Sequence, residues 1–127
     1  MQLELLSGAY SVCRLTGGLA DVDWSGPLTF ACRTPEEFSL VCETARVPGR
    51  VSARQDGFRA LRVAGTLDFS LIGVLSRLTD ILASEGISVF CVSTYDTDYL
   101  LVQECALNQA VCTLRAHDID VKRRIIH

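Results

Sequence analysis

Residues 61–104 read LRVAGTLDFSLIGVLSRLTDILASEGISVFCVSTYDTDYLLVQE, and this stretch predicts one strand, one helix and one hairpin in succession. Asp68 or Ser70 can cap the start of the helix, and Gly86 is placed to end it. The apolar residues of the helix recur at the i, i+3, i+4, i+7 and i+11 spacing of an amphipathic helix and are Leu71, Val74, Leu75, Leu78 and Leu82.

Strands are predicted on both sides of this helix, at residues 58–64, 87–94 and 99–104, with a polar turn at 95–98. Beyond them, a second amphipathic helix and a short edge strand at 119–121 complete the pattern. The order strand, helix, strand, strand, helix, strand is the split βαβ arrangement of ferredoxin-like folds. The sequence therefore predicts an α+β fold with an antiparallel sheet and both helices on one face. The apolar positions of the second helix are Leu107, Ala110, Val111 and Leu114.

The first half of the chain predicts strands and loops without long helices. Apolar runs at 3–6 and 9–15 indicate strands, and the glycine-rich stretch 16–27 indicates a loop. Residues 28–42 predict a hairpin, and residues 44–57, which hold Pro48, Gly49 and Gly57, predict a linker. We expect this half, or a second subunit, to bury the sheet face that the two helices leave open.

The two predicted hairpins resemble each other. Residues 30–43 read FACRTPEEFSLVCE, and residues 90–104 read FCVSTYDTDYLLVQE. Each is a strand, a turn that starts with Thr and carries acidic residues, an aromatic residue, an apolar strand and a closing Glu. The lengths differ by one residue, which we assign to the turn. This degenerate repeat predicts two copies of one unit, of which the first has lost its long helices.

Composition and charge disfavour several classes of function. A chain of 127 residues with 49% hydrophobic and 21% charged residues is an ordinary globular protein of one domain or two very small ones. Its net charge of -3 gives no reason to expect nucleic acid or an anionic membrane as a partner. The basic run 122–124 is expected to be a solvated tail. The first residues do not form a secretory signal, and the apolar stretch 71–82 is too short and polar to span a bilayer, so we expect a cytoplasmic location.

Six cysteines raise the alternatives of a metal site, a disulfide framework or free thiols. No pair forms C-x-x-C, and neither His117 nor His127 stands at metal-ligand spacing from a cysteine. Buried free thiols are the favoured interpretation, with no metal and no cofactor. No catalytic residue is predicted, because the histidines stand near the C-terminus and the motifs of nucleophilic and phosphate-binding enzymes are missing from the sequence.

Residues 61–121 resemble an ACT domain, and the segments LDFSLIG and STYDTDYLLV carry most of the resemblance. The chain is similar to small bacterial tandem-ACT proteins with an S-T-[FY]-D-T-D-Y hairpin, and to the ACT repeats of cytosolic arginine sensors. The resemblance implies a degenerate ACT-like half at 1–57 and an ACT domain at 58–127. It also implies a non-catalytic regulatory module that binds an amino acid at an interface between two ACT units, as a homodimer, and that acts on a separate protein.

Carried onto this sequence, the resemblance implies an effector site made of two segments. The helix N-terminus of the first segment suits a carboxylate, and the aspartates of the second suit an ammonium or guanidinium. The structural alternatives are that Ser70 only caps the helix and that Asp96 and Asp98 are solvated turn residues. A structural module that only dimerises or docks on a partner is the alternative function. The site residues are Leu67, Asp68, Phe69, Ser70, Leu71 and Ile72 in the first segment and Val92, Ser93, Thr94, Tyr95, Asp96 and Asp98 in the second.

Overall fold

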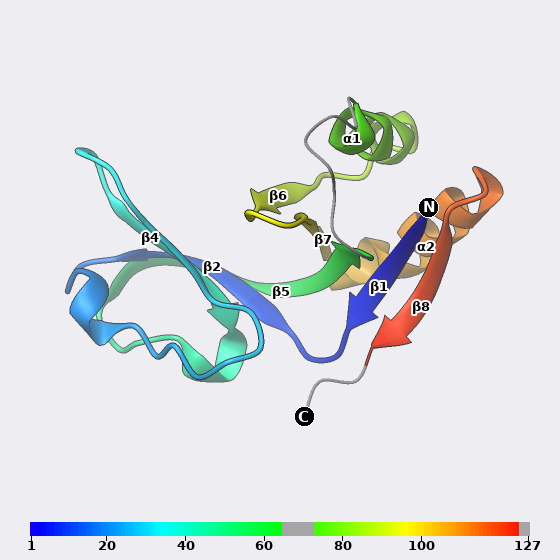
Figure 1. Ribbon diagram of the computed structural model, residues 1–127. Helices are drawn as coiled ribbons and strands as arrows, with labels where there is room; N and C mark the ends of the chain where they lie inside the picture. Colours follow the sequence, from blue (N-terminus) through cyan, green and yellow to red (C-terminus); the bar gives the residue numbers. More distant parts are fainter. Residues whose placement is uncertain (65–72, 125–127) are drawn as a thin grey trace. The chain divides into compact units, whose positions relative to one another are not determined.

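The computed structural model describes residues 1–64 and 73–124, and contacts divide the chain into two compact units. The N-terminal unit is Gly8–Phe58, and the C-terminal unit contains Met1–Ser7 and Arg59–His127. Strand β5 (Val51–Val63) contributes residues to both units (Figure 1). The division into domains after residue 57 stays a prediction; by its contacts, strand β1 (Gln2–Leu6) belongs to the C-terminal unit.

The C-terminal unit has the predicted ferredoxin-like fold, in the strand order β6-β7-β5-β1-β8. Strand β1 pairs antiparallel with β5 and parallel with β8, so the first and last strands of the chain lie side by side (Figure 1). This strand is inserted where a simple split βαβ unit would pair its first and last strands directly. The α+β fold class is confirmed, with one parallel pair added. The other elements of this unit are α1 (Val74–Ser84), β6 (Phe90–Ser93), β7 (Asp98–Gln103), η3 (Glu104–Ala106), α2 (Leu107–Ala116) and β8 (Asp120–Arg124).

Both helices pack on one face of this sheet and close a single apolar core. Leu100 and Val102 alternate along β7 toward that face, because successive side chains of a strand point to opposite sides. Each fully buried leucine contributes roughly 1.5–3 kcal/mol of burial free energy. The helix positions in this core are Leu78, Ile81 and Leu82 of α1 and Leu107, Ala110 and Leu114 of α2.

The prediction that Gly86 ends the first long helix is confirmed. Gly86 has φ 71°, its amide donates to the carbonyl of Ala83 (2.9 Å), and the amide of Ile87 donates to the carbonyl of Leu82 (3.1 Å). These two bonds form a Schellman motif, which satisfies carbonyl groups left over at a helix end. Helix α1 therefore stops where Ile87 enters the core.

The N-terminal unit is built from β2 (Tyr10–Leu15), β3 (Phe30–Arg33), β4 (Phe38–Glu43) and the first part of β5, in the order β3-β4-β2-β5. Its connections hold the short 3-10 helices η1 (Leu19–Asp21) and η2 (Thr44–Arg46). Ion pairs tie these connections down: Arg50 to Asp21 at 2.9 Å, and Arg46 to Asp23 at 3.0 Å. Hydrogen bonds from Ser25 and then Arg46 lower the pKa of Asp23 to about 2.

The predicted linker at 44–57 is wrong, because β5 begins at Val51 and runs through this segment. Gly57 has φ 85°, and the pairing with β2 shifts between Tyr10↔Phe58 and Val12↔Gln55. A glycine with positive φ beside such a shift marks a β-bulge, which leaves one extra residue on the bulged strand. Gly57, which the sequence predicts to be a linker residue, therefore bends a continuous strand.

The repeat of the two hairpins is present in the registers, but the predicted one-residue difference in turn length is wrong. Phe30 pairs with Val41 and Arg33 with Phe38, whereas Phe90 pairs with Leu101 and Ser93 with Asp98. Both turns therefore have four residues, 34–37 and 94–97, and η2 and η3 follow the two hairpins at equivalent places. The sequence pattern matches Glu43 with Glu104, whereas the registers match Glu43 with Gln103.

The basic run at 122–124 is exposed, as expected, but it is not a tail, because these residues form part of β8. Lys122, Arg123 and Arg124 pair with Glu4, Leu5 and Leu6 of β1. These three residues form a strand because they pair with a parallel strand far away in the sequence. A local pattern of charges does not reveal such a partner. Arg124 lies 3.6 Å from Glu4, and Arg62 lies 3.0 Å from the same carboxylate.

We predict that Asp118→Gly stabilises the protein. Asp118 ends α2 with φ 62°, in the same motif that Gly86 forms after α1, and its charge stands at the negative end of the helix dipole. Removing the left-handed strain and the charge should raise the free energy of unfolding by about 1 kcal/mol, measured by urea denaturation. Asp118→Asn removes the charge alone and should give a smaller gain. Equal gains for the two variants would contradict a cost of the backbone conformation.

Candidate functional site

The turn between β6 and β7 is the described half of the predicted effector site. The amide of Thr94 donates to the carbonyl of Thr97 (2.8 Å), and the amide of Thr97 donates to the hydroxyl of Thr94 (3.2 Å). A threonine hydroxyl that accepts from a nearby amide closes a tight turn locally. Tyr95 and Asp96 therefore occupy the tip, where Asp96 is exposed and Tyr95 is 83% exposed.

Thr97 joins this turn to the end of β5. Its side chain is buried, and its hydroxyl donates to the carbonyl of Val63 at 2.7 Å. Val63 is the last residue of β5, and the chain passes through Ala64 into residues 65–72. The acidic turn 94–97 thus lies beside the end of β5, the strand that precedes the first predicted segment of the site.

The two aspartates of the turn have different surroundings. The hydroxyl of Ser93 donates to a carboxylate oxygen of Asp98 at 2.5 Å, and the two residues are partners in the strand register. Asp98 is half-buried, whereas Asp96 is exposed at the tip. Although part of the Cys91 side chain is exposed, desolvation of the thiol, and secondarily the charge of Asp98, raise the pKa of Cys91. The carboxylate of Asp98 thus accepts a hydrogen bond from a hydroxyl of its own hairpin, that of Ser93.

The hairpin divides the predicted residues between its two faces. Ser93 and Asp98 share a face with Leu100, which lies in the core under the helices. Val92 is 3% exposed and points to the opposite face. The structure thus brings Ser93 and Asp98 together and separates Val92 from them.

The first predicted segment, Leu67, Asp68, Phe69, Ser70, Leu71 and Ile72, lies outside the described residues, and the expected caps Asp68 and Ser70 lie outside them too. Helix α1 as described begins at Val74. The preceding residue, Gly73, has φ 81°, and a Cβ at this position would meet no described atom within 4 Å. The approach of a ligand or a second backbone to Gly73 stays a prediction.

Sequence reasoning missed Thr97 as a residue of this site. The sequence around Thr97 gives no local signal for this role, because its partner, the carbonyl of Val63, is defined only by the pairing of distant strands.

The six cysteines are free thiols, but the prediction that they are buried holds only for Cys13 and Cys42. Burial raises the pKa of both thiols, that of Cys42 to about 11. Cys32 is half-buried, and the other three are exposed on β6, η3 and α2: Cys91, Cys105 and Cys112. Apolar neighbours in sequence did not bury them, because neighbours on these elements point in different directions. Among residues 1–64 and 73–124, no group of three or more His, Cys, Asp or Glu side chains is placed to hold a metal ion.

Comparison with known proteins points to one family. The family model of the ACT domain matches residues 53–116, just over half of the chain. The fold of the whole chain is similar to a crystal structure of a protein from Agobacterium tumefaciens, with TM-score 0.87 and 29% identity over 99% of this chain and 95% of that one. No curated protein matches the chain.

Two further structures share this fold. A protein of unknown function from Vibrio cholerae, described as a possible transport protein, has TM-score 0.68 and 28% identity over 91% of this chain and 88% of that one. Aspartate kinase from Clostridium acetobutylicum, described as an allosteric enzyme, has TM-score 0.64 and 10% identity over 87% of this chain and 33% of that one. At 10% identity, the likeness to the kinase concerns the fold alone.

The described helices are short. Within residues 1–64 and 73–124, none has the length and apolar character needed to cross a membrane.

We predict that Thr97→Val destabilises the C-terminal unit. The variant keeps the shape of the side chain but leaves the carbonyl of Val63 without its donor, which costs about 1–3 kcal/mol. Urea denaturation measures the loss. Thr113→Val is the matched control, because the hydroxyl of Thr113 bonds a carbonyl within the exposed part of α2 (2.8 Å) and should matter little. Equal stability of the Thr97 variant and the wild type would contradict an anchoring role.

Proposed function

This chain belongs to the ACT domain family, and on that premise we propose that it is a non-catalytic regulatory module that binds a free amino acid. The family assignment and the ferredoxin-like fold support a regulatory module that binds a ligand. The amino acid as effector, its site at an interface between two ACT units, the homodimer and the cytoplasmic location are parts of the proposal. The N-terminal unit is, in this proposal, a degenerate ACT unit that kept the hairpin and lost the long helices.

The observation that carries the proposal is the hydrogen bond between Thr97 and Val63. It joins the acidic turn 94–97 to the strand that leads into residues 65–72, at 2.7 Å. The proposed site needs these two segments within reach of one amino acid. A turn attached to the far end of the sheet would argue against it.

The charges of the two segments complement an amino acid. An amino acid carries a carboxylate and an ammonium group, and the amides of the first turn of α1, at the positive end of the helix dipole, suit the carboxylate. The first turn of α1 has no acidic residue that would repel this group. We assign the ammonium to Asp96, because it is exposed at the tip, and we assign a positioning role to Asp98, because Ser93 already donates to it.

A structural module without ligand is the second candidate, and the position of β6 favours it. Within the described part of the chain, β6 pairs with β7 alone and is an edge strand. Its residues Phe90 and Cys91 are exposed. Unpaired backbone groups at an edge are a template for pairing with another chain.

We predict that at least one of the twenty amino acids stabilises the protein. A ligand that binds only the folded state adds about 2.7 kcal/mol at a hundredfold excess over its dissociation constant. Thermal unfolding with each amino acid in turn measures this shift, and calorimetry gives the affinity of any that binds. If none of the twenty changes the midpoint, the amino-acid proposal is wrong.

We predict that Asp96→Asn weakens binding of that amino acid. Removing the charge that faces the ammonium should cost about tenfold or more in affinity. Glu36→Gln is the matched control, because Glu36 occupies the same position in the turn of the repeated hairpin. If both variants bind like the wild type, Asp96 does not contact the ligand. Sedimentation with and without each amino acid tests the second candidate, which predicts that no amino acid binds or changes the assembly state.

A further inference from the structure

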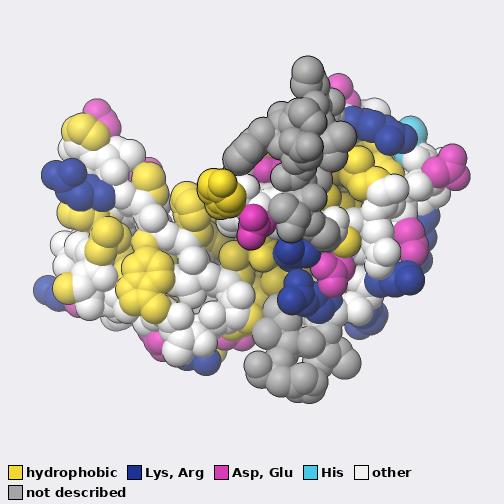
Figure 2. Space-filling model, viewed as in Figure 1, with side chains coloured by type: hydrophobic (Ala, Val, Ile, Leu, Met, Phe, Trp, Pro, Cys, Tyr) yellow, Lys and Arg dark blue, Asp and Glu magenta, His cyan; other side chains and the backbone are white. Residues whose placement is uncertain are grey.

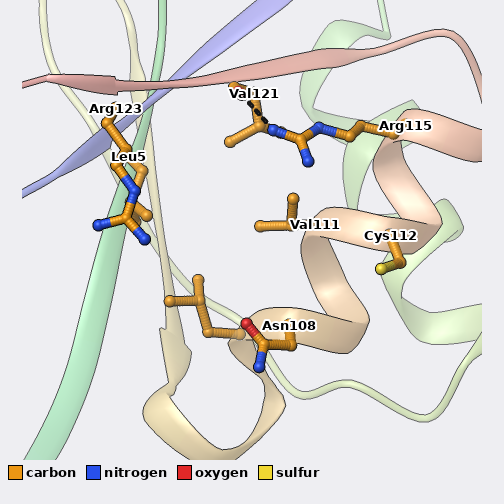
Figure 3. Close-up of a pocket in the computed structure, with 8 residues that line it drawn as sticks. Leu5, Asn108, Val111, Cys112, Arg115, Val121 and Arg123 are labelled. Carbon is orange, nitrogen blue, oxygen red and sulfur yellow. Dashed lines mark hydrogen bonds between the residues drawn. The ribbon is translucent and has the colours of Figure 1, made fainter.

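A cavity of about 300 Å³ lies between helix α2 and the strands β1 and β8 of the C-terminal unit (Figure 3). Its volume is at the lower end of the range of roughly 300–1,000 Å³ for small-molecule pockets. None of its residues belongs to the amino-acid site proposed above. Leu5, Leu107, Val111 and Val121 form its apolar walls, and Asn108, Cys112, Arg115 and Arg123 supply its polar atoms.

Arg123 lies in this cavity because of the register of β8. Leu3 pairs with Val121 and Leu5 pairs with Arg123, and both leucines belong to the core under the helices. Arg123 therefore extends a row of apolar side chains on the face of the sheet that the helices cover. Its neighbour Arg124 points to the opposite face, where it lies 3.6 Å from the carboxylate of Glu4.

Arg115 reaches the cavity from the last turn of α2. Its Nη2 donates to the carbonyl of Val121 at 2.8 Å, and Figure 3 shows this bond holding the guanidinium between the helix and β8. The bond uses one of the five N–H donors of a guanidinium. The position of the second cation of the cavity is thus set by the backbone of β8.

Within residues 1–64 and 73–124, no acidic side chain balances these two cations. The residues that line the cavity include no carboxylate, and among the described residues neither Arg115 nor Arg123 forms an ion pair. On the face seen in Figure 2, by contrast, several Lys and Arg side chains lie beside Asp or Glu side chains. Two exposed guanidinium groups in one lining with four apolar side chains favour an anion with an apolar body.

We propose that this cavity binds a small monocarboxylate with a branched aliphatic tail. The planar forks of Arg115 and Arg123 match the geometry of a carboxylate, and the leucine and valine walls accept the tail. A free amino acid fits less well, because its ammonium finds no carboxylate in the lining and stands near two positive charges. This site is independent of the proposed amino-acid site, and it remains if that proposal fails.

Cys112 provides a local probe, because it lines the cavity and is exposed. We expect 4-methylpentanoate at millimolar concentration to slow alkylation of Cys112 by N-ethylmaleimide, followed by peptide mass spectrometry. Alkylation of Cys105, which is exposed on η3 outside the cavity, should be unchanged. Leucine has the same tail and carboxylate plus an ammonium, and should protect Cys112 less. Inorganic phosphate, which lacks the tail, and 4-methylpentan-1-ol, which lacks the charge, should also protect less.

Two variants test the charges. Arg123→Gln should require about tenfold more 4-methylpentanoate for equal protection, since it removes a charge-assisted contact. Lys122→Gln removes the same charge from the neighbouring residue, which is outside the cavity lining, and should behave like the wild type. Thermal unfolding checks that both variants fold. The proposal is overturned by the absence of protection in the wild type, by equal protection from leucine, or by an Arg123 variant that is protected as well as the wild type.

Discussion

The insertion of β1 between β5 and β8 is the constraint on which the C-terminal unit depends. The backbone of β1 pairs on both sides, with Leu61–Val63 of β5 and with the whole of β8. Leu3 and Leu5 thereby enter the core that the two helices cover. Without this strand, the sheet would lose its connection to β8, and backbone groups of both neighbours would lack partners.

Contacts between strands also place polar groups on both sides of β5. The register with β8 places Arg123 beside Leu5 and so gives a cation to the cavity under α2. On the other side of β5, the carbonyl of Val63 accepts from Thr97 and anchors the acidic turn. Two separate polar sites, one with guanidinium groups and one with carboxylates, therefore depend on the strands around β5. The two proposals predict ligands of different charge for this reason.

The N-terminal unit repeats the hairpin of the C-terminal unit but has no long helix. Both hairpins have the same register and a four-residue turn that begins with a threonine. After the second hairpin, η3 continues into α2, whereas after the first, η2 is followed by Pro48 and then by β5. Proline disfavours helical backbone in the residue before it and offers no amide to a helix that would continue from η2, and β5 begins three residues later.

By itself, the sequence determined the elements that depend on local periodicity and turn chemistry. These are the two amphipathic helices, the stop at Gly86, both hairpins and the ferredoxin-like order, because each is encoded by residues close together in the chain. Tertiary structure alone decided the insertion of β1, the bulge at Gly57, the burial of Thr97 and the position of Arg123. Each of these results from pairing between strands that are distant in the chain, and such a register leaves no local pattern in the sequence.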